Sequence, residues 1–237
     1  MHERYAHGFL RGKRSTKRHL ATASILVAGI VVIAAFVAAP SVASDLGGLC
    51  SGPQELTVGQ WARYQTDVPL LARKMEARYA IVGREAVDGK DHYWLELTIG
   101  TAAGDMILQF LIPSYPFEPE SLQRAVMKMN AALPAMEFPA AAAANLLAND
   151  NLSDPLRQAC EASTSAVEES VTVPAGTFDA HRVPLKRLGK DIWVSPSVPF
   201  AVVKMVDSNG KGLELLDHGT GAESSITETP QKMPGSS

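Results

Sequence analysis

The stretch "MEARYAIVGREAVDGKDHYWLELTIG", residues 75–100, decides the fold because apolar and polar side chains alternate along two successive runs. The second run places four apolar side chains on one face: Tyr93, Leu95, Leu97 and Ile99. A period of two is typical of a half-buried β-strand. Between the runs, Asp88-Gly89 supplies the positive φ angles that a tight hairpin needs. The stretch therefore predicts an antiparallel hairpin.

A third strand is predicted where "DMILQFLIP" follows the turn at Gly104. One face of this strand would carry Met106, Leu108, Phe110 and Ile112. Its other face would carry Ile107 and Leu111, with Gln109 between them. A strand that is apolar on both faces needs protein on both, or protein on one and a cavity on the other.

A second block of strands is predicted from Ala166 onward, beginning with two strands around a turn at Pro174-Ala175-Gly176. Three more strands are expected over 190–195, 200–207 and 213–219, and Ile226 is expected in a last short strand. Asn209-Gly210 is a hairpin signal between two of them. Residues 229–237 are expected to form a disordered tail.

The sequence between the two blocks has a different period. Leu122, Val126, Met129 and Leu133 recur at near-helical spacing, which predicts a helix over 119–133. The alanine-rich run after Pro139 and the segment 153–162 predict two further helices. Strands, then helices, then strands indicate an α+β fold with an antiparallel sheet. We expect one domain over 56–228 with a helical insert over 118–162.

The N-terminus predicts export. A basic stretch is followed by an uncharged apolar run, residues 21–39, and by small side chains before Ser44. This pattern is typical of a secretory signal peptide over residues 1–43. The alternative is an uncleaved membrane anchor, since the run approaches the ~20 residues that span a bilayer. Both readings place the remaining chain in the periplasm or outside the cell, with residues 44–55 as a linker.

The charge balance disfavours two classes of partner. The whole chain carries −3 and its first twenty residues carry six basic and one acidic side chain, which leaves about −8 on the exported part. An acidic domain is a poor candidate for binding nucleic acid or an anionic membrane surface. We therefore expect membrane contact only through residues 21–39, if they are not removed.

The chain has two cysteines, Cys50 and Cys160, and both lie in the exported part. In an oxidising compartment they can form one disulfide, and the alternative is a pair of free thiols. Acylation of Cys50 is disfavoured because Leu49 precedes it where a small residue is expected. No Cys-x-x-Cys or Cys/His spacing indicates metal or redox chemistry, so we expect no metal and no cofactor.

The common catalytic motifs are absent from the sequence: it has no GxSxG, Walker loop, GxGxxG or HExxH. The exported histidines are His92, His181 and His218, all at predicted strands and far apart in sequence. We interpret them as strand residues without a catalytic role, and we expect a protein that is not an enzyme.

Apolar and aromatic side chains on strands and insert give the candidate site. Two-sided strands together with a methionine-rich cover are typical of a site for acyl chains or other apolar ligands. The candidate ligand-binding residues are Tyr79, Tyr93, Leu95, Leu97, Phe110, Met129, Trp193 and Val203. Each of them can equally be part of a filled core.

Four segments carry a family resemblance: "VGQWARYQ", "ARYAIVGREAVDGKDHYWLEL", "VTVPAGTFDAHRV" and "WVSPSVPFAVVKM…LELLDHGTGAESSI". They resemble a group of exported bacterial proteins of unknown function, which is similar to the periplasmic lipoprotein-carrier and lipoprotein-receptor superfamily. The resemblance covers residues 56–226 and implies a curved antiparallel half-barrel with helices on its concave face and an apolar cavity between. Those carriers begin with a helix, whereas residues 44–61 here do not predict one.

Three functions follow as hypotheses. The first is an exported binding protein for a lipid or a lipidated protein. The second is an assembly module that joins a protein partner in the cell envelope through an exposed face. The third is an enzyme, which would require the histidines to converge with acids or a serine in one pocket.

Overall fold

The hairpin predicted from residues 75–100 is present as strands β2 (Arg73–Val87) and β3 (Lys90–Thr101). Asp88 and Gly89 join them with φ angles of 52° and 74°. Strand β4 (Gly104–Ile112) completes the meander. The structure is a computed structural model. It describes residues 46–68, 73–102, 104–147 and 153–232. The predicted meander is thus confirmed.

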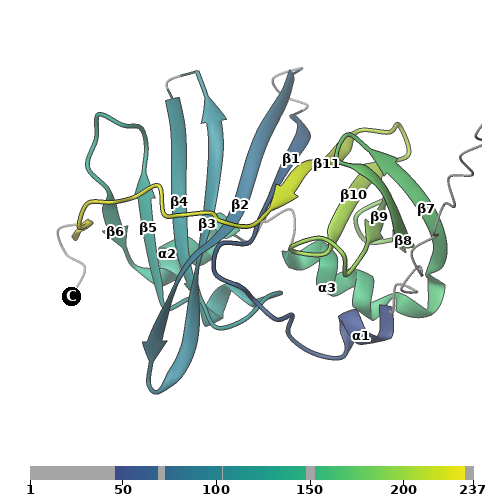
Figure 1. The fold of residues 1–237 in the computed structure, drawn as a ribbon, viewed down its shortest axis with the longest axis horizontal. Coiled ribbons are helices and arrows are strands. Elements are labelled where there is room, and N and C mark those ends of the chain that lie inside the picture. Colours follow the sequence, from purple (N-terminus) through teal and green to yellow (C-terminus); the bar gives the residue numbers. More distant parts are fainter. Residues whose placement is uncertain (1–45, 69–72, 103, 148–152, 233–237) are drawn as a thin grey trace, which may run out of the picture. The chain divides into compact units, whose positions relative to one another are not determined.

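The strands form one large, curved and unclosed sheet in the order β12-β6-β5-β4-β3-β2-β1-β11-β10-β9-β8-β7 (Figure 1). Besides the meander, the strands are β1 (Trp61–Val68), β5 (Arg124–Lys128), β6 (Met136–Phe138), β7 (Val167–Val173), β8 (Gly176–Leu185), β9 (Lys190–Val194), β10 (Val202–Asp207), β11 (Gly212–Gly219) and β12 (Gln231–Lys232). In the described sheet, neighbouring strands are antiparallel except for β12 and β6. This confirms a sheet-dominated α+β fold.

Strand β1 joins the two predicted β blocks, because it pairs with β2 on one side and with β11 on the other. A bulge between Arg63 and Tyr64 shifts the register toward β11. The sheet continues unbroken through this junction, and the described residues from Leu46 to Lys232 therefore make up one compact unit.

The predicted helix over 119–133 is wrong. Only a short 3₁₀ turn, η2 (Pro119–Ser121), precedes strand β5, which pairs with β4. The open edge of β4 offers backbone hydrogen bonds to a partner, and this ladder outweighs the helix propensity of alanine, methionine and leucine. As a result the expected helical face is split: Val126 is buried, whereas Met129 and Leu133 are exposed.

The other helices fit the sequence better. Helices α2 (Ala140–Leu147) and α3 (Ser153–Glu161) are present where they were predicted, and a 3₁₀ turn η3 (Ser163–Ser165) follows. A further helix, α1 (Leu46–Cys50), occupies a segment for which none was expected. Five residues with two glycines cannot form a helix alone, so tertiary contacts must stabilise α1.

The second β block agrees with the prediction in its first strands and differs near its end. Strand β10 begins at Val202, because Phe200 and Ala201 both have positive φ and cannot extend the strand. Ile226 lies in no strand; the last short strand is β12, which pairs with β6. Part of the expected disordered tail is therefore ordered, and residues 233–237 lie outside the described residues.

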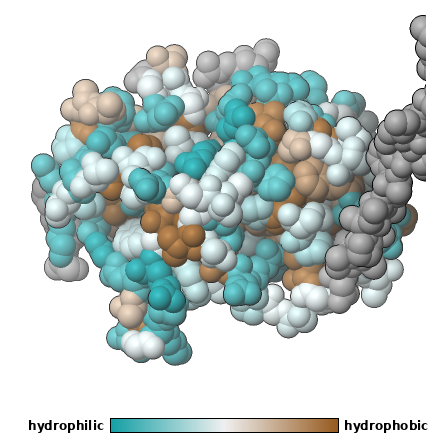
Figure 2. All heavy atoms as spheres, in the orientation of Figure 1, coloured by the Kyte–Doolittle hydropathy of each residue, from teal (hydrophilic) through white to brown (hydrophobic). Residues whose placement is uncertain are grey.

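The C-terminal segment, residues 220–232, covers the second face of β4 and so explains why this strand is apolar on both faces. It runs across the sheet from β11 to β6 (Figure 1). Ile226 packs there with Ile107, Val126 and Ala135, in a small core on the face opposite to the main one. Hydrophilic side chains cover most of the face seen in Figure 2. Protein therefore covers both faces of β4.

A buried glutamate fixes this segment to the sheet. Glu96 of β3 is fully buried, and its carboxylate accepts hydrogen bonds from the Ser225 backbone N–H (2.9 Å) and hydroxyl (2.7 Å). Gln109 of β4 donates a third hydrogen bond at 2.8 Å. Lys128 and Glu228 form an ion pair at 2.6 Å further along the segment. The buried Glu96 carboxylate is thus hydrogen-bonded to the segment and to β4, as buried polar groups usually are.

Glu96→Gln should lower the free energy of unfolding by about 1–3 kcal/mol, because the new amide places a donor opposite groups that already donate. Chemical denaturation of the variant and the wild type measures this loss. Glu168→Gln on the exposed edge of β7 is the matched control and should change stability by less than about 0.5 kcal/mol. A Glu96→Gln variant as stable as this control would contradict the assigned hydrogen bonds.

The predicted leader and its apolar run lie outside the described residues, so cleavage and anchoring stay predictions. Among the helices that the structure describes, none is long and apolar enough to span a membrane.

Candidate functional site

Five of the eight candidate residues share one face of the sheet, which we call the apolar face. Its rows run across the strands: Tyr79 lies beside Leu97, and Leu95 lies beside Phe110. The rows continue onto β5 and β6, where Phe110 lies opposite Ala125, and Ala125 opposite Phe138. Tyr93 of β3 is the fifth member, whereas Met129 lies after the end of β5 and outside the strand register.

Burial differs along the apolar face. Tyr79, Leu95 and Phe110 are buried in the main core, together with Ala143 of α2 and Leu156 of α3. Tyr93 and Leu97 are half-buried against it. Met129 is 49% exposed at the turn between β5 and β6. Protein side chains therefore fill much of this face, and its most buried members are Tyr79, Leu95 and Phe110.

The other two candidates lie on the far side of β1. Val203 is fully buried in β10. Trp193 of β9 is half-buried; its indole N–H donates to Glu169 at 2.6 Å, and Arg182 and Lys204 lie over its ring at 5.5 and 5.8 Å. The same main core nevertheless includes Val203 with Tyr79 and Phe110, and Trp193 packs against it from outside.

An open cleft of about 610 Å³ lies between the N-terminal segment and two turns of the second β block. Its walls are formed by residues 48–60, by the connection between β9 and β10, and by the end of β11. The apolar lining comprises Leu49, Pro53, Pro196, Val198, Pro199 and Phe200. The polar lining comprises Gln54, Glu55, Thr57, Gln60, Ser197, His218 and Thr220. The volume of the cleft and its mixture of apolar and polar side chains are typical of ligand pockets.

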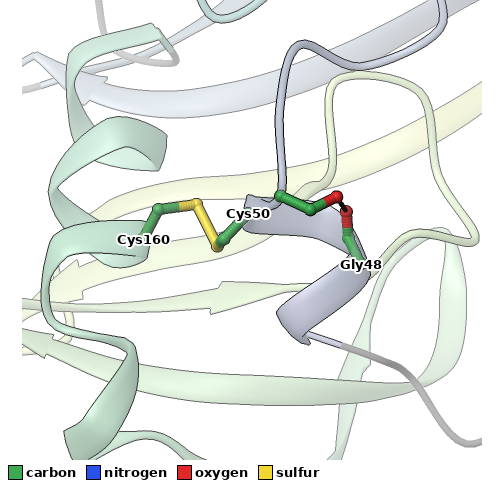
Figure 3. Close-up of a disulfide and its surroundings, with 4 residues drawn as sticks. Gly48, Cys50 and Cys160 are labelled. Atoms are coloured by element: carbon green, nitrogen blue, oxygen red, sulfur yellow. Dashed lines mark hydrogen bonds between the residues drawn. A yellow bond between two sulfur atoms is a disulfide. The ribbon is translucent and has the colours of Figure 1, made fainter.

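A disulfide positions the first wall of this cleft. Cys50 at the end of α1 is bonded to Cys160 in α3, with 5.3 Å between the Cα atoms (Figure 3). The Ser51 hydroxyl donates to the Gly48 carbonyl at 2.9 Å and closes the last turn of α1. The sequence left the state of the cysteines open, and the structure pairs them. α1 thereby presents Gly48 and Leu49 to the cleft.

The second wall is a strained turn. Phe200 and Ala201 have φ angles of 62° and 59°. These values lie in the left-handed region, which residues other than glycine rarely adopt. The Val202 N–H donates to the Phe200 carbonyl at 2.8 Å, which closes a three-residue turn around Ala201. Such outliers persist where surrounding contacts enforce them, and they cluster at binding sites.

Aromatic contacts enforce this turn. The buried Phe200 ring lies 5.2 Å from the Tyr115 ring and 6.2 Å from the Tyr79 ring, measured between centroids. The Tyr64 hydroxyl donates to the Val202 carbonyl at 3.0 Å. Complete burial raises the pKa of Tyr64, so this hydroxyl stays protonated as a donor. Phe200 therefore connects the cleft to the aromatic core of the apolar face.

One polar group in the cleft stands out. The Gln54 backbone N–H donates to the Tyr115 carbonyl at 2.7 Å, which fixes this residue against the core. Its side-chain Nε2 is buried and has no hydrogen-bond partner among the described residues. An unpaired buried donor costs free energy.

The histidines lie on three different strands. His92 is buried in β3 with Nδ1 at 3.1 Å from the Lys90 carbonyl, and His181 lies in β8. His218 alone of the three lines the cleft, with its ring 5.8 Å from that of Phe178. Within the described ranges, no three His, Cys, Asp or Glu side chains are placed to hold a metal ion.

No protein-family model matches the chain, and no curated protein matches it either.

Sequence reasoning missed the cleft for two reasons. Its walls come from segments about 140 residues apart, and α1, which carries one wall, has no sequence signal. A partial signal was present in "SPSVPF", where two prolines interrupt an otherwise apolar stretch. Prolines at such a position indicate a rigid turn, but not what that turn faces.

Proposed function

We propose that the protein is a non-catalytic, exported binding protein of the cell envelope that holds an apolar ligand in the cleft. The observation that carries this proposal is the open cleft of about 610 Å³, whose strained wall reaches the aromatic core through Phe200. In this proposal the curved sheet is a half-barrel and α2 and α3 cover its concave side. The ligand site lies at the edge of that cover.

The chemistry of the walls favours an acylated ligand. The leucine, valine and proline side chains would contact a hydrocarbon chain, which favours burial at about 25 cal/mol per Å². The Gln54 Nε2 would donate to a carbonyl or carboxyl oxygen of the ligand. Within the lining, His218 is the only side chain that can carry a positive charge, which disfavours a ligand with several phosphates. A lipid or a lipidated protein segment meets these requirements.

Binding of a dansylated undecanoic acid, followed by fluorescence, tests the proposal. Leu49→Gln places a polar group in the wall and should weaken binding by about 10–100-fold, the equivalent of one buried leucine side chain. Leu133→Gln makes the same change at a leucine that is 50% exposed outside the cleft, and should bind like the wild type. Equal affinities of both variants, or no binding by the wild type, would refute the proposal. Thermal unfolding confirms that both variants are folded.

A second candidate function is assembly with a protein partner. Met129 and Leu133 expose half of their surface on the turn between β5 and β6, where exposed apolar side chains can form a contact. A Met129→Ser, Leu133→Ser variant that loses a partner captured by crosslinking, while it still binds the dansyl probe, would favour this function.

A further inference from the structure

The turn between β8 and β9 combines an exposed leucine with three cations. Its tip comprises Lys186, Arg187, Leu188 and Lys190, which we call the basic tip. The Leu188 N–H donates to the Leu185 carbonyl at 3.0 Å, and Gly189 closes the turn with a φ of 61°. This backbone leaves the Leu188 side chain 41% exposed at the end of the hairpin.

Nearby acids balance the cations of the basic tip only in part, because Lys190 lies opposite Asp207 in the β9–β10 ladder whereas Lys186 and Arg187 lie in the turn beyond the ladder. In the described part of the chain, Lys186, Arg187 and Lys190 form no ion pair, and Lys211 of the next turn forms none either. Of the nearby acids, Asp191 pairs with Arg182 at 2.6 Å. Asp207 accepts hydrogen bonds from the backbone N–H groups of Asn209 and Lys211, and Glu161 lies at the end of α3. The tip is thus a local positive site on an acidic domain.

Two cavities flank the basic tip. One, of about 260 Å³, lies toward the β10–β11 turn; it is lined by Lys186, Lys190 and Ser208 and also by the acids Asp191 and Asp207. The other, of about 210 Å³, lies toward α3; it is lined by Lys186, Arg187 and Ser165 and also by Glu161. The cavities themselves are therefore of mixed charge, and the exposed cations at the end of the hairpin make up the positive part of the site. Lysine and arginine bind phosphate oxygens through charge-assisted hydrogen bonds.

From this arrangement we propose that the basic tip docks the domain onto an anionic phospholipid surface. Leu188 enters the boundary between headgroups and acyl chains, and the cations on either side of it contact lipid phosphates. An apolar side chain at the centre of the cations favours a membrane over a nucleic acid, which requires an extended basic stripe without such a centre. The site is separate from the cleft and does not depend on the ligand proposed there.

Co-sedimentation with lipid vesicles tests the proposal. The protein used lacks the first 41 residues and keeps the described compact unit, with its core and both cysteines. It should bind vesicles of phosphatidylglycerol and phosphatidylcholine mixed at three to seven, and not pure phosphatidylcholine. Since one cation near an anionic surface contributes about a fivefold change in partitioning, Lys186→Glu with Arg187→Glu should weaken binding by at least about 25-fold. Leu188→Ser should weaken it by about tenfold.

The matched control reverses two cations elsewhere. Arg84→Glu with Lys90→Glu makes the same net charge change on the exposed β2–β3 hairpin and should leave binding close to wild type, apart from the general repulsion. Equal loss of binding in this control would overturn the proposal, as would wild-type binding by Leu188→Ser. Complete displacement of the protein from vesicles by millimolar glycerol phosphate would assign the basic tip to a free phosphate instead.

Discussion

Replacing both cysteines, Cys50→Ser with Cys160→Ser, should lower the free energy of unfolding by about 4–5 kcal/mol. The bond closes a sequence separation of 110 residues, and a loop of that size restricts the unfolded chain by about this amount in the chain-entropy model. Chemical denaturation under non-reducing conditions measures the loss. The wild type with a reductant should approach the same stability, since both treatments remove the same constraint.

The double variant should also lose affinity for the dansyl probe before it loses its fold. α1 is too short to persist without the bond, and it carries Leu49 into the cleft wall. The β2–β3–β4 meander lies outside this wall and should keep its amide protection in hydrogen exchange. A loss of stability below about 1 kcal/mol, or two titratable thiols in the native wild type, would show that the cysteines are not linked.

Phe200→Ala should lower the free energy of unfolding by about 3–5 kcal/mol, the cost of removing a buried phenylalanine ring. The ring is 1% exposed and packs against Tyr79 and Tyr115, so the remaining space cannot easily close. Phe200→Leu keeps most of the volume and should cost less than about 1.5 kcal/mol. Denaturant unfolding of both variants measures the difference.

Val58→Ala serves as the control, because Val58 is exposed before β1 and should change stability by less than about 0.5 kcal/mol. If Phe200→Ala proved as stable as this control, the ring would not be part of the core. The alanine variant should also bind the dansyl probe more weakly, since the strained turn loses the ring that holds it against the aromatic core.

The sequence predicts those parts of the fold in which the pattern is local. Alternation along residues 75–100 and the Asp88-Gly89 turn are enough for the meander, because both strands and their turn lie within about thirty residues. Helices α2 and α3 follow in the same way from composition and capping residues. The predicted α+β class rests on these elements and agrees with the sheet.

The errors lie where a distant partner decides the structure. Residues 124–128 form a strand only because β4 presents an unpaired edge, which the spacing of Leu122, Val126 and Met129 does not reveal. α1 depends on a bond to residue 160, and Ile226 depends on the small core around Val126. The candidate site was predicted only in part for the same reason. Five of its residues share a face through strand register, whereas the cleft forms between segments that no short pattern connects.

The pairing of β1 with both β2 and β11 has a consequence for how the chain acquires its structure. A chain is synthesised from its N-terminus, so one edge of β1 stays unpaired until residues 213–219 of β11 have been synthesised. At typical synthesis rates this interval is on the order of 10–30 s. During this interval the unpaired edge of β1 can form hydrogen bonds with strands of other chains. A chain truncated before Ser225 would leave the buried Glu96 carboxylate without the two hydrogen bonds that Ser225 donates to it.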